Sequence, residues 1–235
     1  MSARFTGKVA LVTGGGSGTG RATALAFARE GATVVVAGRE PRELRETVEL
    51  IEAEGGTADA VMADVTHGMD VIRLMRTIVE RHGGLHIAFN KACPVGDPKP
   101  LVEMCEASWG ENLAANLTGI WLLMKHEIAH MRENGGGAII NNSTNIGSLE
   151  GRVGFGAHAA SKAALAALTR TAAQEHITDG IRINAISPGD RSAPGAPYGK
   201  MAEDDEIANA VVWLADVESQ FVIGHDLILD GAITA

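Results

Sequence analysis

The chain has 235 residues, of which 46% are apolar and 21% charged, and its formal net charge is −9 at pH 7. These values are typical of a globular protein, and the acidic balance without a Lys/Arg stripe argues against nucleic-acid binding. No apolar run is long enough to cross a bilayer and the first residues lack the apolar region of a signal peptide, so we expect a cytoplasmic protein with no membrane partner. The only cysteines, Cys93 and Cys105, lack metal-ligand spacing, which agrees with a reducing compartment and no metal site.

Short apolar runs alternate with stretches of helical period along the chain. The predicted strands are Val9–Val12, Thr33–Ala37, Ala58–Ala63, Leu85–Phe89, Ala138–Asn141, Ile181–Ile186 and Asp226–Leu229. The predicted helices lie near Ala22–Glu30, Pro41–Glu54, Met69–His82, Trp109–Arg132, His158–His176 and Asp204–Leu214. Strands that alternate with helices form right-handed βαβ units and a parallel sheet covered on both faces. The sequence therefore predicts a single α/β domain over residues 1–235, with a Rossmann-type doubly wound parallel sheet of about seven strands.

A glycine-rich segment follows the first predicted strand and precedes an alanine-rich helix. It reads Thr13-Gly14-Gly15-Gly16-Ser17-Gly18-Thr19-Gly20. The free N–H groups and positive dipole end of such a helix form an anion site, and glycines let a pyrophosphate approach the backbone. A flexible loop is the alternative for a glycine-rich string taken alone. The spacing is Thr-Gly-x-x-x-Gly-x-Gly, which differs from the standard G-x-G-x-x-G fingerprint.

With a strand before it and a helix after it, this segment resembles the cofactor turn of the short-chain dehydrogenases/reductases. The resemblance extends to Asp64-Val65 after the third predicted strand, Asn90 after the fourth, Asn116 in the long helix, Lys162 at the start of another helix, Ser187-Pro188-Gly189 after the sixth strand, and the C-terminal segments Phe221 to Asp226 and Asp230-Gly231. It implies that a nicotinamide dinucleotide is held by Gly14, Ser17, Gly18, Thr19, Gly20, Asp64, Val65, Asn90, Lys162, Pro188 and Gly189. It also implies a small-molecule substrate and a homo-oligomer, either a tetramer or a dimer.

The end of the second predicted strand bears on the choice of cofactor. Many NAD-using members of the family carry an acidic residue there, whereas this chain reads Ala37-Gly38-Arg39. The Arg39 guanidinium can pair with a 2′-phosphate, and a solvated surface arginine is the alternative. The resemblance therefore favours NADP(H), with NAD(H) as the second choice.

The catalytic residues of the family are only partly present. Its Asn and Lys positions match Asn116 and Lys162, but the Tyr-x-x-x-Lys pattern places His158 where the tyrosine belongs. His158 either transfers a proton, directly or through water, or is a polar wall residue without a catalytic role. The serine position falls on Thr144 or Asn145, depending on the alignment of the preceding loop, and both side chains can hydrogen-bond a substrate oxygen.

Further departures gather at the same end of the predicted site. Asn90-Lys91-Ala92-Cys93 stands where the family has Asn-Asn-Ala-Gly, and Cys93 is either a thiol activated by Lys91 or a packed, inert cysteine. The predicted substrate loop, about residues 190–203, is short, and its threonine position falls on Ala193 beside Ser192. Tyr198 in this loop, the only tyrosine in the chain, either supplies a phenol to the pocket or lies on the surface.

Three functions fit these residues. The leading one is an NADP(H)-dependent oxidoreductase that acts on a carbonyl or alcohol substrate with an atypical proton-transfer site. The second is a non-redox enzyme on the same scaffold, such as a cyclase, dehydratase or isomerase. The third is a catalytically silent nucleotide-binding or regulatory subunit, because fold alone does not decide function.

Overall fold

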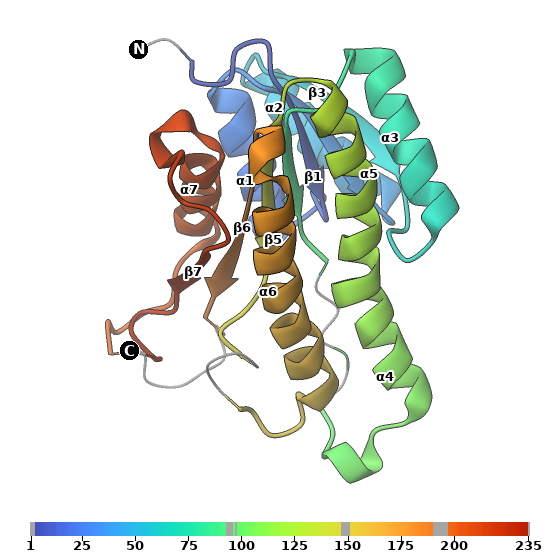
Figure 1. Ribbon diagram of the computed structural model, residues 1–235, viewed down its shortest axis with the longest axis vertical. Helices are drawn as coiled ribbons and strands as arrows, with labels where there is room; N and C mark the ends of the chain where they lie inside the picture. The colour runs from blue at the N-terminus through green and yellow to red at the C-terminus, as the bar shows by residue number, and fades with distance from the viewer. Residues whose placement is uncertain (1–2, 93–95, 97, 147–150, 190–196, 235) are drawn as a thin grey trace.

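The alternation of strands and helices is confirmed in the computed structural model, which describes residues 3–92, 96, 98–146, 151–189 and 197–234 (Figure 1). The strands are β1 (Val9–Thr13), β2 (Thr33–Gly38), β3 (Thr57–Met62), β4 (Ile87–Asn90), β5 (Gly137–Asn142), β6 (Ile181–Pro188) and β7 (Asp226–Leu229). The α-helices are α1 (Gly18–Arg29), α2 (Pro41–Ala53), α3 (Gly68–His82), α4 (Glu106–Leu113), α5 (Gly119–Glu133), α6 (Gly156–His176) and α7 (Asp204–Ala215). Short helical turns are η1 (Leu101–Glu103), η2 (Ala114–Thr118), η3 (Ile177–Asp179) and η4 (Val217–Ser219).

The seven strands form one parallel sheet in the order β3-β2-β1-β4-β5-β6-β7. The order runs outward from β1 to β3 on one side and from β4 to β7 on the other, so the direction of winding reverses between β1 and β4. In open α/β sheets a crevice forms at such a reversal, beyond the carboxyl ends of the strands. The fold therefore places a ligand crevice where the glycine turn follows β1.

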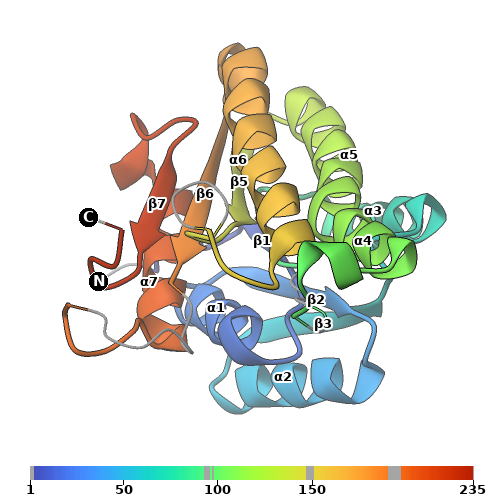
Figure 2. The same ribbon diagram turned by 90° about the horizontal axis from the view of Figure 1, so that it is seen from below.

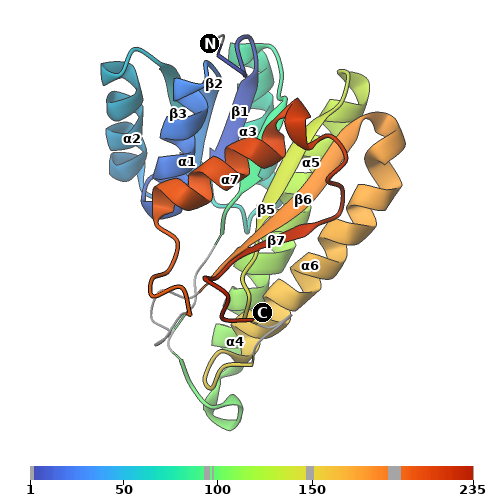
Figure 3. The same ribbon diagram turned by 90° about the vertical axis from the view of Figure 1, so that its left-hand side faces the viewer.

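Alternating side chains on each strand feed two separate hydrophobic cores. Leu11 and Val35 pack with α3, α5 and α6, whereas their neighbours Val12 and Val36 pack with α1, α2 and α7. All four of these side chains are fully buried. Figures 2 and 3 show the two helical layers on opposite faces of the sheet, with α1 and α7 beside each other. The fold class expected from the sequence, a single-domain Rossmann-like α/β fold, is confirmed.

The helix predicted at Trp109–Arg132 is divided by a π-helical turn, η2, between α4 and α5. α4 and α5 run in the same direction (Figure 1), so the predicted course of the chain was right. The prediction of one uniform α-helix was wrong. Just after the π turn, Gly119 lies against the loop that follows β3. A β carbon at Gly119 would lie 2.9 Å from Val65 Cγ2, so the glycine permits this close approach.

Several predicted boundaries were wrong where a polar or small residue obscured the period. α1 begins at Gly18 rather than near residue 22, because the alanine-rich pattern marks only its later turns. Asn90 is the last residue of β4 rather than the residue after it, and Pro188 ends β6 rather than following it. Lys162 lies in the second turn of α6 rather than at its start, because the helix already begins at Gly156. No helix in the described ranges has the length and hydropathy needed to cross a membrane.

Candidate active site

The glycine turn folds tightly between β1 and α1. Gly14 and Gly18 have φ angles of +61° and +51°, the left-handed region that glycine adopts without strain. A β carbon at Gly20 would lie only 2.0 Å from Gly14 O, so this position excludes any side chain. The turn therefore presses the first turn of α1, with the free N–H groups that every helix start carries, against the end of β1.

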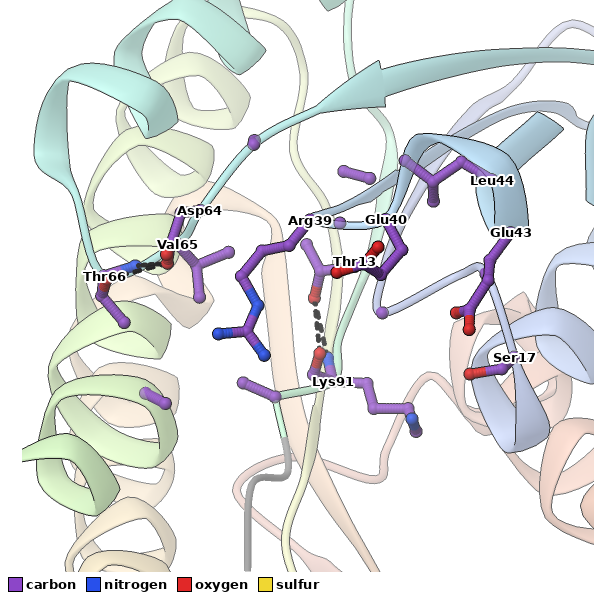
Figure 4. A pocket seen from close by; sticks show the side chains of 17 residues that line it. Thr13, Ser17, Arg39, Glu40, Glu43, Leu44, Asp64, Val65, Thr66 and Lys91 are labelled. Carbon is purple, nitrogen blue, oxygen red and sulfur yellow. Dashed lines mark hydrogen bonds between the residues drawn. The ribbon is translucent and has the colours of Figure 1, made fainter. Parts of the chain in front are cut away.

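A cavity of about 280 Å³ opens at the carboxyl ends of β1, β2, β3 and β4 (Figure 4). Its lining combines the glycine turn, two cationic side chains and several polar groups: Thr13, Gly14, Gly16, Ser17, Ala37, Gly38, Arg39, Glu40, Glu43, Leu44, Ala63, Asp64, Val65, Thr66, Lys91, Ala92 and Ala115. The glycines and the cationic groups of this lining fit the phosphates and sugar of a dinucleotide.

Five of the predicted cofactor residues line this cavity, and the others lie on neighbouring elements. Gly14, Ser17, Arg39, Asp64 and Val65 are the lining members. Gly18, Thr19 and Gly20 belong to the first turn of α1, and Asn90, Lys162, Pro188 and Gly189 lie farther along the same edge of the sheet. The prediction therefore selected residues that the fold gathers at one edge.

Asp64 and Arg39 face each other across the strand ends. Burial acts to raise the pKa of Asp64, but hydrogen bonds from Thr66 N at 2.9 Å and Thr66 Oγ1 at 2.7 Å, with the charges of His67 and Arg39, bring that pKa below its ordinary value. Asp64 is therefore an ionised acceptor at neutral pH. Arg39 is exposed, and Figure 4 shows its guanidinium inside the cavity beside Thr66.

Lys162 is almost completely buried, with 1% of its surface exposed. Its ammonium donates hydrogen bonds to Asn142 O at 2.6 Å and Ala92 O at 3.2 Å. Asn142 is the last residue of β5 and Ala92 follows the end of β4, so the lysine bridges the ends of two neighbouring strands. Its charge is thereby fixed at the edge of the sheet that carries the cavity.

His158 lies one helical turn before Lys162 on α6. Its exposed fraction is 4%, and its Nδ1 has no hydrogen-bond partner among the described residues. Burial, and then the positive charge of Lys162, lower the pKa of His158 to about 4. The imidazole is therefore neutral at pH 7, which is the form that accepts a proton.

The structure distinguishes the two candidates for the serine position. Asn145 is 1% exposed, and its side chain is hydrogen-bonded to the carboxylate of Asp230. Thr144 is 8% exposed, and among the described residues its hydroxyl makes only long contacts of 3.4 Å, to Asn145 Oδ1 and Ile146 N. The Thr144 hydroxyl is therefore more available to a substrate oxygen than the Asn145 amide.

Asn116 lies in the π turn and is fully buried. Its amide donates a 3.4 Å hydrogen bond to Asn112 Oδ1, and the π turn packs against α6. The structure therefore brings Asn116 to the helix that carries His158 and Lys162.

Tyr198 has 73% of its surface exposed and lines a separate hollow with Lys200, Met201, Leu229 and Gly231, and it does not line the cavity at the glycine turn. This favours the surface interpretation of the residue. The hypotheses about Cys93, Ser192 and Ala193, and most of the predicted substrate loop, lie outside the described residues.

Two residues that the sequence reasoning left out are prominent. Lys91 lines the cavity, although the sequence marked it only as a departure from the family pattern and as a neighbour of Cys93. Glu127 is fully buried on α5 and accepts a hydrogen bond from Asn90. The burial of Glu127 could have been predicted from the sequence, because Glu127 falls on the apolar stripe of α5 that Ile120, Leu123 and Met131 form.

Comparisons with known proteins agree with this geometry. A family model described as short chain dehydrogenase matches residues 8–196. The cyclohexanol dehydrogenase of an Acinetobacter species is 33% identical, over 100% of this chain and 98% of that protein. The A-factor type gamma-butyrolactone 1'-reductase of Streptomyces virginiae is 36% identical, over 98% and 96%. The cis-4-hydroxycyclohexanecarboxylate dehydrogenase of Sinomonas cyclohexanicum is 35% identical over 100% of both chains.

Solved structures give the same result. A short chain dehydrogenase from Mycobacterium smegmatis superposes with a TM-score of 0.90 and 33% identity, over 96% of this chain and 92% of that one. A citronellol catabolism dehydrogenase from Pseudomonas aeruginosa superposes with a TM-score of 0.92 and 30% identity, over 100% and 98%. This chain belongs to the short-chain dehydrogenase/reductase family.

Proposed function

We propose that this protein is an NADP(H)-dependent oxidoreductase that interconverts an alcohol and a carbonyl compound, with His158 in the proton-transfer role. The observation that carries the proposal is the pairing of a glycine-lined cavity at the switch in strand order with a buried His158–Lys162 pair on α6. The dehydrogenase and reductase names of the relatives support an oxidoreductase.

The residues at the cavity fit a nicotinamide dinucleotide. We assign the phosphates to Gly14, Ser17, Gly18, Thr19 and Gly20, because side chains are excluded at Gly20 and the helix start offers free N–H groups. We assign the adenine side to Asp64 and Val65, and the nicotinamide side to Asn90, Lys162, Pro188 and Gly189. Arg39 extends into the cavity and supports NADP(H) over NAD(H) by pairing with the 2′-phosphate.

The cofactor, when bound, accepts or donates the hydride, and the residues of the chain manage the proton. In the oxidation direction the substrate loses a hydride from carbon and a proton from oxygen, and neutral His158 accepts that proton directly or through a water. Thr144 donates a hydrogen bond to the substrate oxygen. Lys162 holds the ribose and disfavours a charged His158, and Asn116 supports the relay behind them.

The names of the relatives suggest a substrate class. Cyclohexanol dehydrogenase and cis-4-hydroxycyclohexanecarboxylate dehydrogenase are named for secondary alcohols on six-membered rings, and the gamma-butyrolactone 1'-reductase is named for a reduction on a ring-bearing substrate. We therefore propose a cyclic secondary alcohol and its ketone as the substrate pair.

A paired test separates cofactor choice from proton transfer. Calorimetric titration is expected to show tighter binding of NADPH than of NADH, and Arg39→Met is expected to remove the difference. In a panel of cyclic alcohols and ketones, His158→Phe is expected to lower kcat about 100-fold or more without weakening NADPH, because one proton-transfer group is lost. His158→Tyr, which restores the residue typical of the family, is the matched control. Unchanged turnover in His158→Phe would refute the role of His158, and conversion without net change in nicotinamide absorbance would favour the non-redox alternative.

We further propose a cytoplasmic homo-oligomer. β7 is an edge strand of the sheet, and exposed apolar side chains lie on and beside it, including Phe221 at 89% and Ile228 at 40% exposure. Light scattering after size-exclusion chromatography is expected to give the mass of a tetramer or dimer, and Phe221→Asp is expected to shift it toward the monomer.

A further inference from the structure

Lys91 is fixed beside the glycine turn through its backbone. Its N–H donates to Thr13 Oγ1 at 2.9 Å, and the same hydroxyl donates to Lys91 O at 3.2 Å. Thr13 is the last residue of β1 and directly precedes the turn. The segment that follows β4 is therefore held at the point where the turn begins.

The ammonium of Lys91 lies over the first glycine of the turn. A β carbon at Gly14 would lie 2.9 Å from Lys91 O and 3.6 Å from Lys91 Nζ. Figure 4 shows the Lys91 side chain running toward the side of the cavity that holds Ser17, whereas the Arg39 guanidinium lies on the side of Thr66. The two cations therefore occupy different parts of one cavity.

Acidic side chains also lie close to the glycine turn. A β carbon at Gly16 would lie 3.2 Å from Glu43 Oε2, and one at Gly18 would lie 3.9 Å from Asp204 Oδ2. Two carboxylates thus border the turn, while the start of α1 supplies only about half a positive charge. Lys91 Nζ makes no hydrogen bond or ion pair with any described residue, so its charge is available to a ligand.

We propose that Lys91 pairs with the pyrophosphate of the bound dinucleotide, while Arg39 recognises only the 2′-phosphate. This assignment rests on the proposed function. The two cations then differ in what they bind. Lys91 contacts the pyrophosphate, which NADP⁺ and NAD⁺ share, and Arg39 contacts the 2′-phosphate, which only NADP⁺ carries.

The test is calorimetric titration of the full chain with NADP⁺, NAD⁺ and adenosine at two salt concentrations. Lys91→Met is expected to weaken NADP⁺ and NAD⁺ by the same factor, about 10- to 100-fold, because it removes a charge-assisted contact. Adenosine, which has no phosphate, is expected to bind the variant as it binds the wild type. Lys91→Arg is expected to keep most of the affinity, and Arg39→Met is expected to weaken NADP⁺ alone. The affinity of wild type is expected to fall more steeply with added salt than that of Lys91→Met.

The outcomes distinguish this assignment from the proposed function. Tight binding of both dinucleotides by wild type that Lys91→Met leaves unchanged would overturn the role of Lys91 alone. A loss confined to NADP⁺ would also overturn it, because Lys91 would then contact the 2′-phosphate. A wild type that binds neither dinucleotide would overturn the proposed function and this assignment together. Unchanged circular dichroism and thermal unfolding of Lys91→Met and Lys91→Arg serve as the control for folding.

Discussion

Replacing Glu127 by glutamine is expected to stabilise the protein by an amount that grows with pH. Glu127, Asn90 and Asn141 are all fully buried between α5 and the ends of β4 and β5. Asn90 Nδ2 donates to Glu127 Oε2 at 2.9 Å and to Asn141 Oδ1 at 3.2 Å. Glu127 Oε1 and Asn90 Oδ1 have no hydrogen-bond partner in the described part of the chain. An ionised carboxylate here would be a buried charge that no described residue pairs with as a counter-ion.

The magnitude follows from the pKa of this carboxyl. Burial raises the pKa of Glu127 from 4.5 to about 8, against the smaller opposing effect of the Asn90 hydrogen bond. The folded protein therefore keeps the proton up to about pH 8, whereas the unfolded chain loses it near pH 4.5, so the free energy of unfolding falls as the pH rises between these values. At 1.36 kcal/mol per pH unit above pH 4.5, the free energy of unfolding falls by about 3 kcal/mol at pH 7 and by about 5 kcal/mol above pH 8. Glutamine does not titrate, and its amide offers Asn90 both a donor and an acceptor.

The assay is urea unfolding of wild type and Glu127→Gln at about pH 5, 7 and 9, with Glu133→Gln as the matched control. Glu133 is an exposed glutamate at the end of the same helix, so its replacement is expected to change stability by less than about 0.5 kcal/mol at every pH. The gain from Glu127→Gln is expected to be small at the lowest pH and largest at the highest. An equal gain at all three pH values, or a loss that grows with pH, would refute the reasoning.

Three further predictions concern the turn, α7 and the imidazole. Gly20→Ala is expected to abolish dinucleotide binding and destabilise the fold, because its β carbon would lie 2.0 Å from Gly14 O. The control is Gly110→Ala at an open helical position, which is expected to raise the free energy of unfolding by about 0.5–1 kcal/mol, measured by thermal unfolding. Arg182→Lys is expected to cost about 2 kcal/mol in urea unfolding, because Arg182 donates to four backbone carbonyls at the end of α7 and beyond, and a gain would contradict this. Relative to His158→Gln, wild type is expected to lose up to about 3 kcal/mol of its free energy of unfolding as pH falls from 6.5 to 4, because the unfolded chain takes up the proton first. The same dependence of stability on pH in both proteins would disprove a buried neutral imidazole.

The sequence was sufficient for the fold because the fold depends on local patterns. Apolar runs between helical stretches located all seven strands, and Pro41 correctly marked the start of α2. The errors fell where a residue's chemistry opposes its surroundings. Asn90 was placed after β4 because it is polar, yet it is buried in the strand and pairs across to Asn141.

The site was less accessible to sequence reasoning, because its contacts join distant parts of the chain. Thr19 is hydrogen-bonded to Asp204 at the start of α7, and the Asn145 side chain is hydrogen-bonded to Asp230. Neither pairing leaves a local pattern. The link to Asp230 is what favours Thr144 over Asn145, a choice that two equally acceptable alignments left open.

The central claim, hydride transfer through this cavity with His158 managing the proton, is tested most directly with NADPH carrying deuterium at the transferable C4 position. The protein is incubated with this cofactor and a panel of cyclic ketones, and the alcohols are analysed by mass spectrometry. We expect an alcohol that carries one deuterium at its carbinol carbon, formed in amounts equal to the NADPH consumed and strongly reduced in His158→Phe. Alcohol without deuterium, or a wild type that consumes no NADPH with any ketone of the panel, would contradict it.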